Sequence, residues 1–165
     1  MASGEIDPDL TTEMPAEPAE RVRALVERVV ETLDLEATVL VEEVETEIRA
    51  TVEGDELDLL IGGDGETIDA LQYIASRAAF ADTGERKAVV IDAAGYRERR
   101  ELALHGAADR AATDALATGR PIELAPMSSS ERKIVHQYLA QRGDVETHSE
   151  GQEPARRLVV TPATD

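Results

Sequence analysis

The stretch Glu131-Arg132-Lys133-Ile134-Val135-His136 indicates how the C-terminal part of this sequence folds. It places an Arg and a His four residues apart, and residues at that spacing share one face of a helix. The apolar stripe that such a helix would bury consists of Ile134, Val135, Tyr138 and Leu139. Arg132 and His136 would lie together beside that stripe, as a permanent cation and a titratable donor suited to a phosphate. An ordinary helix with a solvated Arg and a surface His fits the same spacing.

The segments on either side of this helix carry a longer pattern. They are Leu124-Ala125-Pro126-Met127-Ser128 before it, and Val145 to Gly151 and Glu153 to Val160 after it. Together with the Arg-x-x-x-His spacing, these segments resemble the R-three-H domain, and more narrowly the version found in the bacterial Jag family (SpoIIIJ-associated proteins). The resemblance covers most of residues 95–162, including the run from Gly95 to Arg100 at its start.

The turn and capping residues predict the elements of this C-terminal domain, residues 95–165. A helix over 96–118 should end at Gly119, with Pro121 just beyond it. A short strand at 121–124 should precede the signature helix, which a Ser128–Glu131 capping box opens and Gly143 closes. Residues 145–149 and 157–161 read as an antiparallel pair. The predicted order is α-β-α-β-β.

A second pattern is the glycine loop Ile61-Gly62-Gly63-Asp64-Gly65. Two glycines three residues apart let a nucleic-acid backbone approach closely, and the helix that follows directs its free N–H groups to the same place. Its sequence, Thr67 to Ile74, resembles the Jag helix that follows the glycine loop. We predict helix 18–33, strands 37–44 and 46–53 with Ile48, Ala50 and Val52 on one face, helices 56–61 and 66–82, and a strand at 88–91. In the helix over 66–82, Ile68, Leu71, Ile74 and Ala78 should be buried.

This order, α-β-β-α-α-β over residues 18–94, is that of a type II KH domain, whose loop clamps about four nucleotides. The chain is therefore expected to be an α+β protein with a type II KH-like domain followed by an R-three-H domain. The resemblance implies that Gly62, Gly63, Asp64 and Gly65 form one nucleic-acid site. The family commonly has basic residues where Gly63 and Asp64 stand, so it stays open whether this loop binds RNA or survives only as a turn.

The charge of the chain is unevenly distributed. The net charge is −18, but residues 95–165 hold ten of the seventeen Lys and Arg residues and have a net charge of −1. Residues 21–94 have eighteen acids against seven bases, for −11. A local Arg cluster can still hold phosphate in an acidic protein. We expect weak, salt-sensitive nucleic-acid binding.

The remaining composition limits the class of protein. Residues 1–17 are acidic and without apolar periodicity, so we expect a disordered tail, in place of the N-terminal domain that many Jag proteins carry. The 165 residues include no Cys, few aromatic residues, and no segment that would span a membrane. The lack of Cys and of a membrane segment leads us to expect a cytoplasmic protein. We expect no metal and no cofactor, because the three His residues have no metal-ligand spacing. No nucleophile elbow is present, so we expect no catalytic site of that kind.

Further cations could join the site. Arg156 and Arg157 fall within the R-three-H resemblance and are predicted to bind nucleic acid with Arg132 and His136. Arg97, Arg99 and Arg100 could extend the groove, or could pair with Glu98 and Glu101. His105 and His148 are expected to be structural or exposed to solvent.

The leading hypothesis is therefore a non-enzymatic protein that binds single-stranded RNA, with single-stranded DNA left open as a further ligand. The resemblance further implies an RNA chaperone or post-transcriptional regulator linked to the cell envelope or division, with a small stand-alone KH protein as a candidate partner. The alternative is an adaptor whose acidic KH half contacts a basic protein instead. Scarce aromatic residues argue against extensive base stacking.

Overall fold

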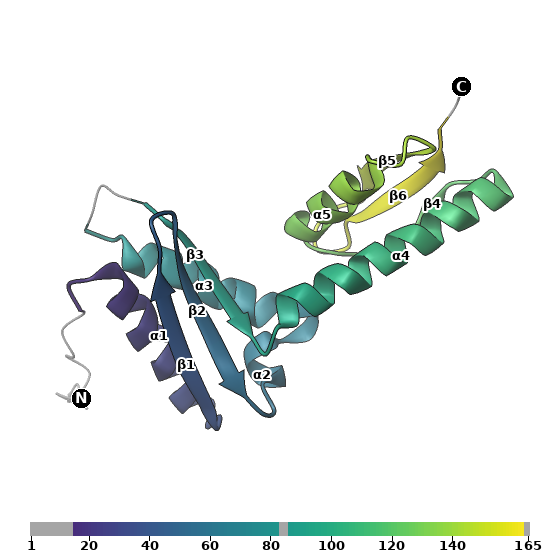
Figure 1. Cartoon of the computed structure of the whole chain (residues 1–165). Helices are drawn as coiled ribbons and strands as arrows, with labels where there is room; N and C mark the ends of the chain where they lie inside the picture. Colours follow the sequence, from purple (N-terminus) through teal and green to yellow (C-terminus); the bar gives the residue numbers. More distant parts are fainter. Residues whose placement is uncertain (1–14, 83–85, 164–165) are drawn as a thin grey trace, which may run out of the picture. The chain divides into compact units, whose positions relative to one another are not determined.

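A computed structural model describes residues 15–82 and 86–163 of the chain. The chain divides into two compact units, with the division after Tyr96. Figure 1 shows the helices and strands of both units. Each unit has its own aliphatic core and is described separately. The predicted disorder of residues 1–17 falls almost wholly outside the described residues.

The N-terminal unit is a three-stranded sheet with helices packed on one of its faces (Figure 1). Its elements are α1 (Pro18–Thr32), β1 (Ala37–Glu43), β2 (Glu47–Gly54), α2 (Asp58–Ile61), the 3₁₀ turn η2 (Gly63–Gly65), α3 (Glu66–Ala79) and β3 (Ala88–Ala93). The strand order is β1-β2-β3, with β1 antiparallel and β3 parallel to β2. This is the predicted α-β-β-α-α-β order.

The core of the N-terminal unit follows the predicted alternation in β2. Ile48, Ala50 and Val52 are fully buried against α1 and α3, as predicted. The prediction for α3 was partly wrong: Ile68 and Leu71 are buried, but the next buried positions are Ala75 and Ala79, and Ile74 is 54% exposed. Ile74 lies about 120° around the helix from Ile68, because each residue turns an α-helix by about 100°.

The C-terminal unit also packs helices against a small sheet. Its elements are α4 (Tyr96–Thr118), β4 (Ile122–Glu123), α5 (Ser129–Leu139), β5 (Val145–Glu150) and β6 (Arg157–Pro162). The sheet is antiparallel with the order β4-β6-β5. The core joins the alanines of α4 to Val135 and Leu139 of α5 and to Leu158 and Val160 of β6. The order is the predicted α-β-α-β-β.

Two helix ends differ from the prediction. Helix α3 ends at Ala79, three residues before the predicted end. Helix α5 ends at Leu139, and the chain reaches Gly143 through tighter turns, with Gln141 and Arg142 donating to carbonyls three residues earlier. Such bonds commonly tighten the last turn of a helix, so a closing glycine can stand several residues beyond the helix itself.

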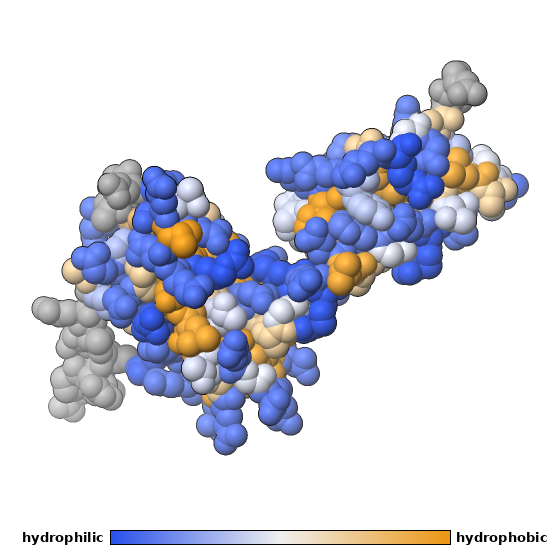
Figure 2. All heavy atoms as spheres, viewed as in Figure 1, coloured by the Kyte–Doolittle hydropathy of each residue, from blue (hydrophilic) through white to orange (hydrophobic). Residues whose placement is uncertain are grey.

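The visible surface of both units is mostly polar. Figure 2 shows mostly hydrophilic residues on the visible face of both units, with small scattered hydrophobic areas. Among the described helices, none has both the length and the apolar composition of a membrane-spanning segment.

Candidate nucleic-acid interface

The capping box predicted from the sequence sets the start of α5. Ser128 Oγ accepts a hydrogen bond from the Glu131 amide at 3.3 Å, and the Glu131 carboxylate accepts one from the Ser128 amide at 2.8 Å. This reciprocal pair satisfies two amides that a helix leaves without partners, so the helix starts at Ser129. The start of the helix in turn fixes the face on which Arg132 and His136 lie.

An open cavity of about 380 Å³ lies between α5 and the strands β5 and β6, and we call it the α5–β5 cavity. Its lining residues are Ser129, Arg132, Lys133, His136, Thr147, His148, Ser149, Arg156 and Leu158. Among the described residues, the lining contains three permanent cations, two His residues and three hydroxyls, and no carboxylate. Because a phosphate needs cationic and neutral donors, this composition suits an anion.

Arg132 is the most constrained of these cations. It is 8% exposed, and it donates to the Met127 carbonyl at 2.7 Å and to the Glu153 carboxylate at 2.6 Å. These bonds tie the start of α5 to the segment that leads into β6. Because the Glu153 carboxylate already supplies a counter-charge, the full charge of Arg132 is not available to a ligand. Arg132 therefore acts as a positioning residue.

His136 is exposed on the same face, one turn further along α5. Its Nδ1 and the Thr147 hydroxyl share a hydrogen bond, which fixes the imidazole ring against β5. The second ring nitrogen, Nε2, remains available for a ligand. The structure thus brings Arg132 and His136 to one cavity, as predicted from their spacing.

Arg156 is the most distinctive cation of the cavity. It is half-buried, its Nε is shielded from solvent without a hydrogen-bond partner among the described residues, and no described carboxylate pairs with it. Buried polar groups are nearly always hydrogen-bonded, and a buried N–H without a partner costs about 1–3 kcal/mol. An acceptor in the cavity would offset this cost.

Arg157 does not line the α5–β5 cavity. Neighbouring residues of a strand point to opposite faces of the sheet. Arg157 therefore points away from Arg156, and it donates to the Glu123 carboxylate of β4 at 2.7 Å. Arg157 thus lies on the face of the sheet away from the cavity, where its partner is Glu123.

The cations at the start of α4 also lie outside the lining of the cavity. Arg100 donates at 2.7 Å to Glu131, the carboxylate that completes the capping box of α5 and a partner that the sequence did not predict. Of the further arginines that the sequence placed beside Arg132 and His136, only Arg156 lines the cavity. Lys133 lines it as well.

The glycine loop has the backbone geometry that the sequence predicted. Gly62 and Gly65 have φ values of 74° and 85°, and Asp64 has a φ of 52°. A Cβ on Gly65 would lie 2.7 Å from the Tyr96 ring, so glycine is needed there on two grounds. Gly63 has open space around it, and Gly63 and Asp64 are exposed at the tip.

The charges around the glycine loop oppose an anion. Asp64 is in the loop, and Glu66 and Asp69 are in the first turn of α3. These carboxylates stabilise the positive end of the helix dipole, which a phosphate would otherwise use. The backbone of this loop would therefore allow a phosphate to approach, whereas the charge of the nearby carboxylates would oppose it.

A polar cluster anchors the other end of α5. The Tyr138 hydroxyl donates to Asp109 of α4 at 2.8 Å, and Arg142 donates to Asp144 at 3.0 Å and to Asp109 at 3.3 Å. The hydrogen bond to Asp109 raises the pKa of Tyr138, and the hydrogen bond from Arg142 lowers the pKa of Asp144. The Tyr138 ring also stacks on His105 at 4.0 Å, which gives His105 the structural role expected of it.

His148 is exposed on β5, as predicted, although part of it borders the cavity. Among the described residues, no three His, Asp or Glu side chains are grouped as a metal site would require. Sequence reasoning missed the contributions of Lys133, Thr147 and Glu153. Alternation along β5 could have indicated Thr147, whereas nothing in the local pattern indicated Glu153, which is 21 residues from Arg132.

Comparison with known proteins agrees with this two-unit architecture. The KH domain of KhpA and KhpB matches residues 19–91, and the R-three-H domain matches residues 102–162. The fold and the cavity thus define a protein with a KH domain followed by an R-three-H domain, as the sequence predicted.

Several RNA-binding proteins named KhpB match most of the chain. The RNA-binding protein KhpB of Clostridium symbiosum is 34% identical over 137 residues, which are 82% of this chain and 62% of that protein. The KhpB of Bacillus subtilis (strain 168) is 32% identical over 147 residues, which are 88% of this chain and 71% of that protein. The chain belongs to the KhpB family, also called the Jag family. It spans only 43% of the KhpB of Streptococcus pneumoniae (strain D39), to which it is 33% identical.

Proposed function

We propose that this chain is a non-enzymatic protein that binds single-stranded RNA, with one phosphate held in the α5–β5 cavity. The observation that carries the proposal is Arg156, a half-buried cation without a described counter-ion in a cavity whose described lining has no carboxylate. Membership of a family whose relatives are named RNA-binding proteins supports RNA as the source of that phosphate.

Each residue of the cavity has a distinct role in this proposal. Arg156 and Lys133 supply positive charge, and His136 Nε2 supplies a hydrogen bond from a ring that Thr147 orients. Arg132 holds the cavity together through Met127 and Glu153. Arg157 would meet RNA only on the outer face of the sheet, where Glu123 already pairs with it.

The test is a fluorescence-anisotropy titration of short single-stranded RNA with the intact chain at two salt concentrations. Arg156→Ala should weaken binding about tenfold, because a hydrogen bond to a charged group contributes about 1.5–3 kcal/mol. The dependence of log K on log salt should also become shallower by about 0.7 for each phosphate that the variant no longer neutralises. Arg120→Ala is the matched control, because Arg120 is exposed in the same unit and does not line the cavity.

Arg132→Ala is a poor substitute for this test. It would leave the Met127 carbonyl and the Glu153 carboxylate without their shared partner, so reduced binding could reflect a displaced loop. If Arg156→Ala and Arg120→Ala bind RNA equally well, the α5–β5 cavity is not the phosphate site. If the intact chain binds no RNA even at low salt, the proposed function is wrong.

A second candidate function follows from the carboxylates around the glycine loop. With Asp64, Glu66 and Asp69 there, the N-terminal unit could act as an adaptor for a basic protein. Salt-sensitive binding to a polycationic peptide, lost when Asp64 and Glu66 are neutralised and accompanied by no affinity for RNA, would favour this function over RNA binding.

Finer roles come from the family resemblance. They are RNA chaperone activity or post-transcriptional regulation linked to the cell envelope or division, a cytoplasmic location, and a small stand-alone KH protein as partner. Chaperone activity predicts faster annealing of two complementary RNAs in the presence of the chain, and partnership predicts that a KH protein co-purifies with it. Unchanged annealing and no co-purification would remove these roles without affecting the RNA site.

A further inference from the structure

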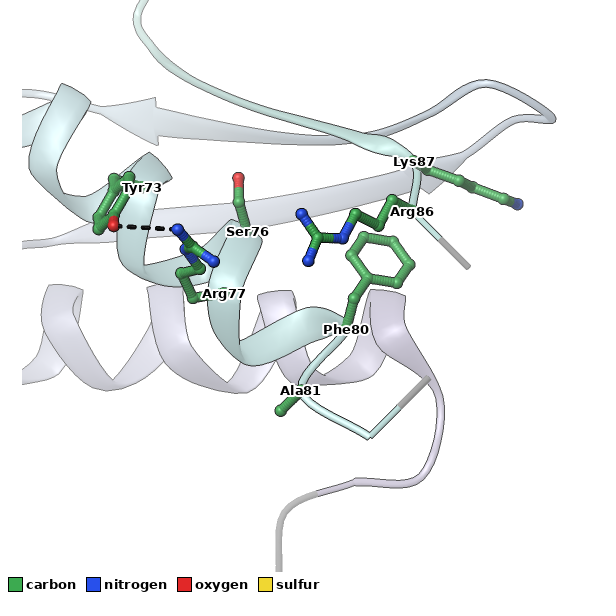
Figure 3. A pocket seen from close by; sticks show the side chains of 7 residues that line it. All are labelled: Tyr73, Ser76, Arg77, Phe80, Ala81, Arg86 and Lys87. Atoms are coloured by element: carbon green, nitrogen blue, oxygen red, sulfur yellow. Dashed lines mark hydrogen bonds between the residues drawn. The ribbon is translucent and has the colours of Figure 1, made fainter. Parts of the chain in front are cut away.

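A second cavity lies in the N-terminal unit, at the C-terminal end of α3, and we call it the α3 cavity. It has a volume of about 290 Å³, and its lining residues are Tyr73, Ser76, Arg77, Phe80, Ala81, Arg86 and Lys87. Figure 3 shows these side chains on α3 and on the segment that enters β3. The volume is at the lower end for ligand pockets, so the cavity suits one small group.

The lining of the α3 cavity is basic although the unit is acidic. It holds three of the seven bases in residues 21–94, a region with eighteen acids, and none of the described lining residues is acidic. The adjacent Asp82 is paired with Arg21 at 3.2 Å, so its charge is partly compensated. Positive charge in this unit is therefore concentrated at one place.

The individual cations differ in their availability. The Lys87 amine points away from the cavity and bonds to Glu43 at 2.7 Å (Figure 3). The Arg77 guanidinium lies over the Tyr73 ring, 5.4 Å from its centre, and the Arg86 side chain extends toward α3 (Figure 3). The carbonyl end of α3 carries a partial negative charge, which Arg77 in the last turn offsets.

Two of the four aromatic residues of the whole chain line this cavity. Tyr73 is 62% exposed, whereas Phe80 packs partly against the core of the unit. Exposed aromatic rings beside Arg guanidinium groups are what proteins use to stack the bases of single-stranded nucleic acid. Scarcity of aromatics along the chain thus does not exclude stacking at this one place.

The two ends of α3 differ in charge. Asp64, Glu66 and Asp69 surround its N-terminal end, and Arg77 and Arg86 lie near its C-terminal end, about 20 Å away for a helix of 14 residues. The described cations that line the α3 cavity therefore lie at the end of α3 opposite these carboxylates.

We propose that the α3 cavity binds one nucleotide of a single-stranded RNA, with the phosphate at Arg77 and Arg86 and the base against Tyr73. The proposal rests on the proposed function, since it takes the same class of ligand. It places the main electrostatic contact of the N-terminal unit at the far end of α3 from the glycine loop.

The test uses the intact chain and the anisotropy titration. Arg77→Ala/Arg86→Ala should weaken RNA binding about fivefold or more, and each phosphate left without its cation should make the salt dependence shallower by about 0.7. The matched control is Arg28→Ala/Arg49→Ala, which changes the net charge equally at two exposed arginines of the same unit outside the cavity. Tyr73→Leu should weaken binding at unchanged salt dependence, because it removes the ring and no charge.

Ultraviolet crosslinking of the native chain to RNA, followed by mass spectrometry, supplies a second measurement. We expect RNA on the peptide that contains Tyr73 and Phe80. If the intact chain binds RNA and Arg156→Ala weakens it, but Arg77→Ala/Arg86→Ala matches its control and no crosslink forms on that peptide, the α3 cavity proposal is overturned while the proposed function stands. If the intact chain binds no RNA, the proposed function fails first.

Discussion

Arg132 and Arg156 show how one residue type serves two purposes in the same cavity. Arg132 is bound by Met127 and Glu153 and fixes the segment before β6, whereas Arg156 has no described counter-ion and is free to meet a ligand. A guanidinium has five donors, so Arg132 can hold the structure with some of them and still face the cavity. Arg132, the Arg of the Arg-x-x-x-His signature, therefore acts first as a positioning residue.

Glu153 competes with a ligand for Arg132, which gives the first prediction. Glu153→Gln keeps the size of the side chain and an acceptor for Arg132 but removes the charge that opposes a phosphate. We expect RNA binding to tighten about two- to fivefold at low salt, because exposed ion pairs contribute about 0.2–1 kcal/mol. Anisotropy titration measures this, with Glu98→Gln as an exposed control in the same unit outside the cavity lining. Equal or weaker binding by Glu153→Gln would show that Glu153 does not compete.

The second prediction concerns the charge of Asp64 in the glycine loop. Asp64→Asn removes the carboxylate and keeps a residue that tolerates the left-handed backbone, where Asp64 has a φ of 52°. If RNA passes over the loop, Asp64→Asn should bind about twofold more tightly. Asp34→Asn is the matched control, because Asp34 is exposed and has a φ of 54° in another turn. An equal gain from both variants would mean that only the net charge matters.

Individual site residues were predictable where local spacing determines their position. The i, i+4 spacing brought Arg132 and His136 to one cavity, and the two loop glycines adopt the expected positive φ values. The alternation of side chains along a strand could also have separated Arg157 from Arg156, although the sequence analysis placed both at one site. The Arg132–Glu153 pair depends on a turn that links residues far apart in sequence, which local patterns do not reveal.

At the scale of elements, α5 is fixed at both ends by polar side chains. The capping box begins the helix, and the cluster of Tyr138, Asp109, Arg142 and Asp144 anchors its other end to α4. The sequence predicted the first of these, because a capping box has fixed spacing. It did not predict the second, since Tyr138 was assigned to the apolar stripe of the helix, and the partner of its hydroxyl lies on another helix.

The polar cluster makes the stability of the C-terminal unit depend on pH. The hydrogen bond from Arg142 holds the pKa of Asp144 below its usual 3.8 in the folded state. Its stabilising effect is therefore present above about pH 4 and is lost as the pH falls through the folded value. The pKa of Tyr138 is raised, so the pH dependence of its stabilising effect runs the other way. This effect is present below pH 10 and is lost as the pH rises further.

Urea denaturation at a series of pH values measures this effect. Asp144→Asn should lose less stability than the intact chain below about pH 4, and Tyr138→Phe should lose less above about pH 10. Asp114→Asn, an exposed position of α4 outside the cluster, should follow the intact chain at both limits. Parallel curves for Asp144→Asn and the intact chain would show that Arg142 does not stabilise the carboxylate.

At the scale of the whole molecule, the order of elements was the most predictable property. Every predicted helix and strand is present in order, because apolar periodicity and turn residues act over short distances. The buried face of α3 was less predictable. Ile74 is largely exposed, and the helix buries Ala75 and Ala79 instead. The limits of 18–94 and 95–165 for two independently folding domains stay predictions.

If both proposed RNA sites bind one strand, affinity should depend on RNA length. An oligonucleotide of about four nucleotides occupies one site at a time, whereas a strand of about 12 nucleotides that occupied both would gain affinity through effective concentration, by up to about 10²-fold. Additional binding registers alone would raise affinity only about in proportion to length. We therefore expect the 12-nucleotide RNA to bind far more than threefold more tightly than the four-nucleotide RNA.

This length advantage should disappear when either cavity is disabled. Arg156→Ala leaves the α3 cavity intact, and Arg77→Ala/Arg86→Ala leaves the α5–β5 cavity intact, so each variant should retain affinity for the short RNA through its remaining site. Anisotropy titration of both RNAs against the intact chain and both variants separates the two contributions. If both variants keep the full length advantage, the cavities do not act on one RNA strand, and each unit must bind its ligand independently of the other.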